Sequence, residues 1–133
     1  MIIGIGVDIV EISRIKDSLN RFGEKFVERI FTKGEILNAD KKDNENIKVN
    51  YYAKRFAAKE AFSKAIGLGI GRGINFTDIE IINDSKGKPK IKLNSNARSF
   101  LQDHLKQNNF KIDVSLSDTR EIAQAFVVVS ENF

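Results

Sequence analysis

The chain has 133 residues, of which 41% are hydrophobic and 30% are charged, values typical of one compact domain with its own core. It contains no cysteine and one histidine, which excludes disulfides and thiolate catalysis and leaves acid–base or metal chemistry mainly to carboxylates and lysines. The net charge of +4 favours anionic partners, whether nucleic acid, phosphorylated small molecules or an acidic protein.

No apolar run reaches the ~20 residues that a membrane-spanning helix needs. The apolar start of the chain, MIIGIGVDIVE, lacks the basic stretch and the cleavage site of a signal peptide. We therefore expect a cytoplasmic protein without a membrane partner, forming a single domain over residues 1–133.

Residues 1–10 predict a strand, because isoleucine and valine residues alternate along it at odd-numbered positions. The opposite face of this strand carries Gly4, Gly6 and Asp8. Apolar spacing then predicts a helix that stops near Gly23, followed by a short helix around residues 26–31.

A third short helix is expected after Thr32, because T-K-G-E with Glu35 three residues on is a capping-box pattern. The polar stretch 40–48 (DKKDNENIK) is expected to be a solvated loop. The strongest helix prediction covers residues 49–66, which are rich in Ala, Lys, Arg and Glu and are followed by Gly67.

The last part of the chain predicts strands, turns and one more helix. The expected elements are a glycine-rich loop at 67–73, a hairpin of strands at 76–82 and 89–93, a helix capped by Ser95, and strands at 111–117 and 121–130. The order of elements predicts an α+β fold, with a mostly antiparallel sheet packed with helices on one side.

Asp8 is the first candidate functional residue. It lies inside an apolar strand, and its neighbours two and four residues back are both glycine. Glycines inside a strand often mark a place that another group approaches closely, so a carboxylate there suits a metal ion or a phosphate-bearing ligand. The alternative is that Asp8 only ends the strand and caps the following helix.

Glu60 and Lys64 lie one turn apart on the long helix. At ~100° per residue, both fall within the stripe of small and apolar residues formed by Ala53, Phe56, Ala57 and Ala61. A carboxylate buried there needs a cation, which Lys64 or a metal would supply. The alternative is an ordinary Glu–Lys pair on a solvated face. In that case Tyr52, Phe62 and Ile66 would form the buried apolar face of the helix.

The loop GLGIGRG at 67–73 contains several backbone N–H groups beside Arg72, and such loops can hold phosphate oxygens. Its glycines fall at every second residue, which matches neither a P-loop nor the G-x-G-x-x-G spacing. Taken by itself, the segment is more simply interpreted as a helix C-cap followed by a connecting loop.

Basic residues gather on two predicted helices. They are Arg14, Lys16, Arg21, Lys25 and Arg29 early in the chain, and Lys54, Arg55, Lys59 and Lys64 on the long helix. The simplest interpretation is a solvated face, and the functional one is attraction of an acidic partner or of phosphate. His104 is expected to be an exposed surface residue, and no Ser-His-Asp, zinc or cysteine-nucleophile arrangement can be assembled.

Three segments together resemble one family. GIGVDIVE at 4–11, RFAAKEAFSKA at 55–65 and GLGIGR at 67–72 are similar, in order and spacing, to holo-acyl-carrier-protein synthases, the short-chain type of 4′-phosphopantetheinyl transferase. The total length also agrees. The resemblance implies the fold of that family and transfer of phosphopantetheine from coenzyme A to a serine of apo acyl-carrier protein, in fatty acid biosynthesis, with release of adenosine 3′,5′-bisphosphate.

By this resemblance, Asp8 and Glu60 hold Mg²⁺ against the coenzyme A pyrophosphate, and two carboxylates suit this hard cation. Glu60 and Lys64 are the expected catalytic residues: Glu60 accepts the serine proton, directly or through a metal-bound water, and Lys64 balances charge on the phosphates. The expected coenzyme A-binding residues are Arg55, Lys59, Lys64, Gly69, Gly71 and Arg72.

The resemblance further implies that Arg14 and Arg21 contact an acidic helix of the carrier protein, and that the chain forms a homotrimer with active sites at subunit interfaces. Many family members carry histidines in the penultimate strand and in the turn after it, where this chain has Asp113 and Asp118. A step that depends on those histidines cannot operate here. Asp113 lies either near the metal as a third carboxylate or simply at a strand edge.

Two other classes of function are weighed against this one. The positive charge favours a nucleic-acid-binding domain weakly, but the basic residues are interspersed with 18 acidic ones, and Asp8 and Glu60 would have no role. A non-catalytic interaction subunit is consistent with the missing histidines, but the intact set of Asp8, Glu60 and Lys64 argues against it. The expected partners are therefore coenzyme A and apo acyl-carrier protein, not nucleic acid.

Overall fold

The computed structural model describes residues 1–132, so the last residue of the expected domain 1–133 lies outside the described part. A strand and four helices come first, followed by a hairpin, a fifth helix and two long strands. Their bounds are β1 (Ile2–Glu11), α1 (Ile12–Phe22), α2 (Glu24–Ile30), α3 (Lys33–Asp40), α4 (Glu45–Ile66), the 3₁₀ turn η1 (Phe76–Asp78), β2 (Ile79–Asn83), β3 (Pro89–Leu93), α5 (Ser95–Leu105), β4 (Phe110–Asp118) and β5 (Ile122–Glu131).

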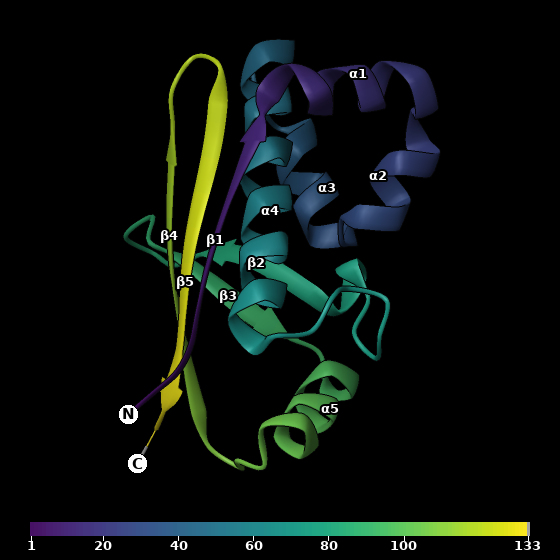
Figure 1. Ribbon diagram of the computed structural model, residues 1–133. Helices are drawn as coiled ribbons and strands as arrows, with labels where there is room; N and C mark the ends of the chain where they lie inside the picture. Colours follow the sequence, from purple (N-terminus) through teal and green to yellow (C-terminus); the bar gives the residue numbers. More distant parts are fainter. Residues whose placement is uncertain (133) are drawn as a thin grey trace.

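The strands form two antiparallel sheets. The long sheet has the order β1-β5-β4, and β2 pairs with β3 in a separate hairpin. Figure 1 shows that the helices lie to one side of the long sheet, with α4 running along it. The prediction of an α+β fold with a mostly antiparallel sheet is confirmed. Within residues 1–132, no helix combines the length and the apolar character that crossing a membrane requires.

The central helix α4 begins earlier than its sequence predicts. Asn44 caps it by accepting a hydrogen bond from the Ile47 backbone N–H at 2.9 Å, so the second half of the expected loop 40–48 is helical. The first turn of α4 is exposed, which explains its polar sequence. At the other end, Gly67 takes the left-handed conformation (φ 72°) as predicted for a C-cap.

Two smaller expectations are corrected and one is confirmed. Asn94, not Ser95, caps α5, because its side chain accepts from the Ala97 backbone N–H at 2.9 Å. The expected strand at 76–82 starts with the 3₁₀ turn η1 and becomes extended only at Ile79. The capping box of Thr32 and Glu35 is present as predicted.

Gly4 and Gly6 allow α4 to lie directly on β1. A Cβ atom on Gly4 would overlap the backbone carbonyl of Ala65, and one on Gly6 would overlap that of Ala61. The sequence correctly predicts a close approach at these glycines, but the approaching group is the protein's own helix rather than a ligand. The side chain of Asp8, on the same face of β1, therefore lies at the border of a tight helix–strand contact.

In the part of the chain that the structure describes, no helix covers the other face of the long sheet (Figure 1). Its apolar side chains remain exposed, with accessible fractions of 54% for Ile5, 41% for Val7, 58% for Ile9 and 43% for Phe126. Register places them together, because Val7 pairs with Phe126 across the β1–β5 ladder. A contiguous apolar sheet face of this kind is typical of an interaction surface.

Candidate functional site

Asp8 and Lys64 meet across the contact between β1 and α4. The Asp8 Oδ1 atom lies 3.1 Å from Lys64 Nζ, which also donates a hydrogen bond to the Val7 carbonyl at 3.0 Å. The Asp8 side chain is 17% exposed and that of Lys64 is 55% exposed. The strand continues to Glu11, which is the N-cap residue of α1. The alternative role of Asp8 as a strand end and helix cap is therefore wrong.

Glu60 joins this pair from the partly open side of α4. Between Tyr51 and Ile66 most residues of α4 are buried, whereas Phe56, Glu60 and Lys64 are not. Their four-residue spacing places them on one stripe of the helix. Burial and the nearby Asp8 raise the pKa of Glu60 above its usual value, and Lys64 opposes this rise. Glu60 therefore lies close enough to feel the charges of both Asp8 and Lys64, while the ion pair of Lys64 is with Asp8.

This donor set fits a magnesium ion. Mg²⁺ prefers one or two carboxylates and takes its other oxygens from phosphate and water. The raised pKa of Glu60 indicates that its charge is incompletely balanced by the protein alone. Within residues 1–132, no group of three or more His, Cys, Asp or Glu side chains has the arrangement of a metal site. Asp8 and Glu60 are the two carboxylates that would hold the ion.

Asp113 does not complete this site within one chain. It pairs with Val128 of β5, and Val128 pairs with Ile5 of β1. Residues opposite one another on neighbouring strands share a face, so Asp113 lies on the face of Ile5, away from α4. The interpretation of Asp113 as a third carboxylate beside Asp8 of the same chain is therefore wrong.

Asp118, at the second of the usual histidine positions, is bound by the first half of α4. It accepts a hydrogen bond from Asn50 Nδ2 at 2.7 Å and lies 3.6 Å from Lys54 Nζ. Lys54 precedes Glu60 by six residues, which is about 9 Å along the helix axis. Asp118 therefore anchors the β4–β5 turn to α4.

Lys59 was expected to bind coenzyme A, and this prediction is wrong. Its side chain is fully buried, and Nζ donates to Glu35 Oε1 at 2.6 Å, the Ile30 carbonyl at 2.7 Å and the Phe76 carbonyl at 3.1 Å. Burial lowers the pKa of Lys59, and Glu35 opposes this effect. Since an ammonium group has three donors, none is left for a phosphate.

Arg55 lies beside a separate hollow of about 190 Å³. Its guanidinium stacks over the Tyr51 ring at 3.8 Å and donates from Nη2 to Asn83 Oδ1 at 3.4 Å. Its Nε atom is buried and finds no hydrogen-bond partner among residues 1–132. Lys42 and Lys54 line the same hollow. Arg55 points about 140° around α4 from Glu60, so one chain does not bring the two side chains together.

The glycine-rich loop follows directly from the end of α4, close in sequence to Lys64. Its backbone is partly bonded to itself, because the Gly71 N–H donates to the Ile74 carbonyl at 2.7 Å and the Arg72 N–H donates to the Gly69 carbonyl at 3.3 Å. These two amides are therefore not free to hold a phosphate in this conformation. The Arg72 side chain is exposed beside the loop.

Arg14 and Arg21 are both exposed on α1. Their seven-residue spacing is about two helical turns, so they lie on the same side of α1. An apolar hollow of about 430 Å³ adjoins this helix, lined by Ser18, Phe22, Lys25, Phe26, Arg29, Ile30, Phe56 and Phe76. The sequence does not reveal this hollow, because Phe56 and Phe76 are far from α1 along the chain.

His104 is exposed, as predicted. Its Nε2 atom lies 3.0 Å from the Ile66 carbonyl at the end of α4, and its ring stacks on Phe100. The side chain therefore links α5 to the last turn of α4.

The raised pKa of Glu60 predicts a gain in stability on removing its charge. The ionised carboxylate is less favourable in the folded than in the unfolded chain, since burial and Asp8 raise the pKa of Glu60 above 4.5. We expect Glu60→Gln to raise the urea midpoint at pH 7 in the presence of a chelator. The gain should disappear below pH 4.5, where Glu60 is protonated in both states. A lower midpoint at pH 7 would contradict this reading.

Comparison with known proteins identifies the family. A model of the 4′-phosphopantetheinyl transferase superfamily matches residues 4–124. The holo-[acyl-carrier-protein] synthase of Bradyrhizobium diazoefficiens is 46% identical over 133 residues, covering 98% of this chain and 95% of that protein. The corresponding synthase of Wolbachia pipientis subsp. Culex pipiens is 43% identical, with coverage of 97% and 98%.

Solved structures agree. The crystal structure of the holo-[acyl-carrier-protein] synthase of Neisseria meningitidis has a TM-score of 0.88 at 39% identity, covering 98% of this chain and 100% of that one. The synthase of Bacillus anthracis, solved in complex with CoA (3′,5′-ADP), has a TM-score of 0.82 at 38% identity, covering 99% of both chains. The resemblance carried by the segments at 4–11, 55–65 and 67–72 is confirmed: the chain belongs to the 4′-phosphopantetheinyl transferase superfamily.

Proposed function

We propose that this protein transfers the 4′-phosphopantetheine group from coenzyme A to a serine of apo acyl-carrier protein, as a step of fatty acid biosynthesis. The observation that carries this proposal is the convergence of Asp8, Glu60 and Lys64 from β1 and α4 at one partly open site. It is supported by relatives named holo-[acyl-carrier-protein] synthase and by a related structure in complex with CoA.

In this reaction the serine oxygen forms a bond to the phosphorus that bears pantetheine. The bond from that phosphorus to the bridging oxygen of the pyrophosphate breaks, and adenosine 3′,5′-bisphosphate leaves. Mg²⁺ held by Asp8 and Glu60 would neutralise charge on the pyrophosphate. Lys64 adds a positive charge beside the departing phosphate, and Glu60 takes up the serine proton.

We place the nucleotide end of coenzyme A at Arg55, with Lys42 and Lys54 beside it. These cations suit phosphate oxygens, and the unpartnered Nε atom of Arg55 is a free donor among residues 1–132. Because Arg55 and Glu60 point to different sides of α4, coenzyme A would reach from the carboxylates of one copy to the Arg55 hollow of a neighbouring copy. Gly69, Gly71 and Arg72 would border the bound molecule next to Lys64.

This arrangement requires the homotrimer that the family resemblance implies. Its support here is the exposed apolar face of the long sheet, where Val7 and Phe126 lie side by side, next in sequence to Asp8. We expect Val7→Lys to convert the trimer into monomers, because a charge would be buried in the subunit contact.

The mass of the assembly in solution, measured by light scattering, tests this expectation. Leu37→Lys is the matched control, since Leu37 is a 63% exposed apolar residue on α3, on the helical side of the molecule. It should leave the mass unchanged. A wild-type monomer, or a Val7→Lys protein that keeps the wild-type mass, would contradict the proposed interface.

The carrier protein would dock on α1. Arg14 and Arg21 offer positive charge to an acidic helix, and the apolar hollow beside α1 offers a place for its apolar side chains. With coenzyme A and a carrier protein as substrates, we place the protein in the cytoplasm.

The decisive experiment for this function mixes the protein with coenzyme A and apo acyl-carrier protein and measures the mass of the carrier. The expected result is a phosphopantetheine mass gain with Mg²⁺ that is lost with a chelator. No gain with Mg²⁺ or with other divalent metals would overturn the proposed function. Tight binding of nucleic acid with a steep salt dependence would favour the rival class instead.

A further inference from the structure

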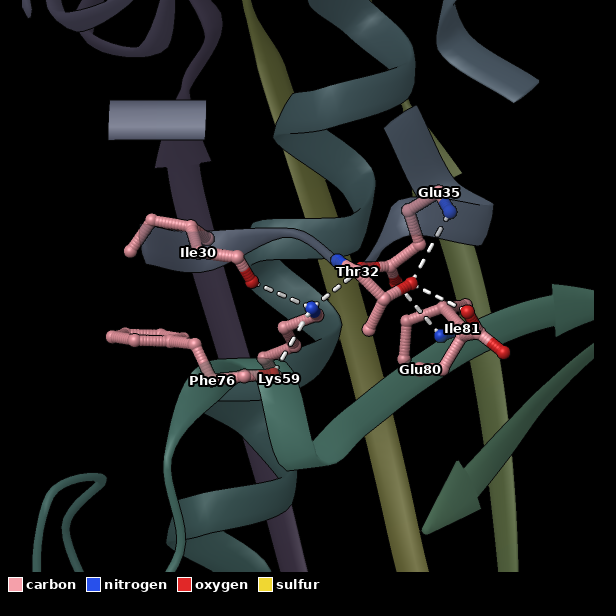
Figure 2. A network of polar contacts seen from close by, with 7 residues as sticks. All are labelled: Ile30, Thr32, Glu35, Lys59, Phe76, Glu80 and Ile81. Atoms are coloured by element: carbon pink, nitrogen blue, oxygen red, sulfur yellow. Dashed lines mark hydrogen bonds and ion pairs between the residues drawn. The ribbon is translucent and has the colours of Figure 1, made fainter. Parts of the chain in front are cut away.

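Lys59 and Glu35 form a buried ion pair that joins five elements of the chain, α2, α3, α4, η1 and β2. Figure 2 shows the Lys59 ammonium between the Ile30 and Phe76 carbonyls, with the Glu35 carboxylate beside it. The Lys59 side chain is 0% exposed and that of Glu35 is 1% exposed. Glu35 also accepts hydrogen bonds from the backbone N–H groups of Thr32 at 2.9 Å and Ile81 at 2.8 Å. All polar contacts of this pair are made inside the protein.

The two carbonyls that Lys59 binds belong to residues of the apolar hollow beside α1. Ile30 ends α2 and Phe76 begins η1, and both line that hollow. The Phe76 ring stacks on Phe56 of α4 with ring centroids 5.8 Å apart. One wall of the hollow is thus fixed to α4 both by the Lys59 ammonium group and by the contact of Phe76 with Phe56.

The position of Lys59 on α4 connects this wall with the reacting carboxylate. Phe56 lines the hollow, and Glu60 lies one turn further along the same open stripe. Lys59 precedes Glu60 directly in the sequence and points to the interior. The distance between the hollow and Glu60 therefore depends on how α2 and η1 are held against this turn of α4.

We propose that Lys59, together with Glu35, is a positioning residue for the carrier protein, holding the Ile30 and Phe76 wall of the docking hollow in register with Glu60. This inference rests on the proposed function, because the hollow is assigned there to the carrier protein. Lys59 does not touch either substrate.

Chemistry explains why a lysine serves here. Two backbone carbonyls and a carboxylate converge on one point. Without Lys59 both carbonyls would lose a donor, and the buried Glu35 carboxylate would lose the cation that balances its charge. An apolar side chain would fill the space but leave the segments free to slide, whereas three directed hydrogen bonds fix their relative position. The pair therefore contributes more to the exact position of α2 and η1 relative to α4 than to net stability.

The test uses the full-length protein with Lys59→Met, which keeps the length of the side chain but removes all three donors. Initial rates are measured with carrier protein varied at saturating coenzyme A, and then with coenzyme A varied at saturating carrier. We expect the KM for the carrier to rise by at least about tenfold, as for loss of an important docking contact. The KM for coenzyme A should stay within about twofold.

Lys48→Met is the matched control. Lys48 is also on α4 and also pairs with α3, through Asp40 at 3.1 Å, but this ion pair is at the surface. It binds no segment of the hollow and should leave both KM values unchanged. Glu35→Gln is the second variant, because glutamine can keep the capping box while removing the charge that Lys59 faces, and it should raise the carrier KM in the same direction.

Three results would overturn the inference: an unchanged carrier KM in Lys59→Met, an equal rise in both KM values, or a loss of activity that is fully explained by a smaller fraction of folded protein. If Lys59→Met does not fold, Glu35→Gln decides by the same criteria. Titration of labelled apo carrier protein into each variant repeats the test without turnover. A wild-type protein that binds the carrier but transfers nothing would refute the proposed function, while the difference in carrier affinity still decides on Lys59.

Discussion

Asp8→Asn and Glu60→Gln should each lower the rate of phosphopantetheine transfer by about 10³-fold or more, while leaving the protein folded. Both changes keep the size of the side chain and remove a negative charge from the place where Mg²⁺ would bind. Stabilisation of a pyrophosphate transition state by a metal ion amounts to several kcal/mol, and each ~1.4 kcal/mol is worth a factor of ten in rate. Losing one of two carboxylates should remove much of this contribution.

The measurement is the initial rate of carrier modification over a series of Mg²⁺ concentrations. Each variant should need more Mg²⁺ than the wild type, and Glu60→Gln should remain slow at saturating Mg²⁺ because it also lacks the proton acceptor. Asp43→Asn, in the exposed turn before α4, is the control and should react at the wild-type rate. Near-normal rates for either site variant at low Mg²⁺ would remove that residue from the metal site.

Stability separates this loss from a general defect. Burial and Asp8 raise the pKa of Glu60, so Glu60→Gln should be at least as stable as the wild type at pH 7 without metal. An inactive protein that resists urea better than the active one would be the signature of a site whose charges are kept together for function. The effect of Asp8→Asn on stability is different, because this variant also loses the ion pair with Lys64.

Local patterns in the sequence predict the elements well and the long-range contacts poorly. The capping box at Thr32 and the glycine stop at Gly67 are confirmed because both depend on residues a few positions apart. The sequence predicts the start of α4 too late, because the polar residues of its exposed first turn resemble a loop. Asn44, whose side chain caps the first turn of α4, is itself part of that polar run.

The candidate site shows the same division. Asp8 and Glu60 stand out in sequence because each is a carboxylate in apolar surroundings, and the structure brings them to one site with Lys64. Lys59 looks like any other basic residue of the helix. Its burial follows from Ile30 and Phe76, which are 29 and 17 residues away in sequence. The one local signal was Glu35, whose capping box placed a carboxylate at the start of α3.

The same limit applies to the glycines of β1, which the sequence marks as a place of close approach without naming what approaches. Since α4 occupies that place, Gly6→Ala should cost more than about 3 kcal/mol in the free energy of unfolding. The added Cβ would overlap the Ala61 carbonyl and approach the Ala65 backbone nitrogen. Backbone atoms cannot turn aside as a side chain can, so helix and strand must separate, which is a severe form of overpacking.

Urea denaturation of Gly6→Ala and Gly69→Ala, in parallel, measures this cost. At Gly69 an added Cβ meets open space and φ is not positive, so the control should lie within about 1 kcal/mol of the wild type. Any Gly6→Ala protein that folds should also lose transfer activity, because separation of α4 from β1 pulls Glu60 and Lys64 away from Asp8. Equal stabilities for the two variants would mean that the helix is not seated on the strand. The tight packing of α4 on β1 would then no longer explain how two carboxylates 52 residues apart in sequence come to lie at one candidate site.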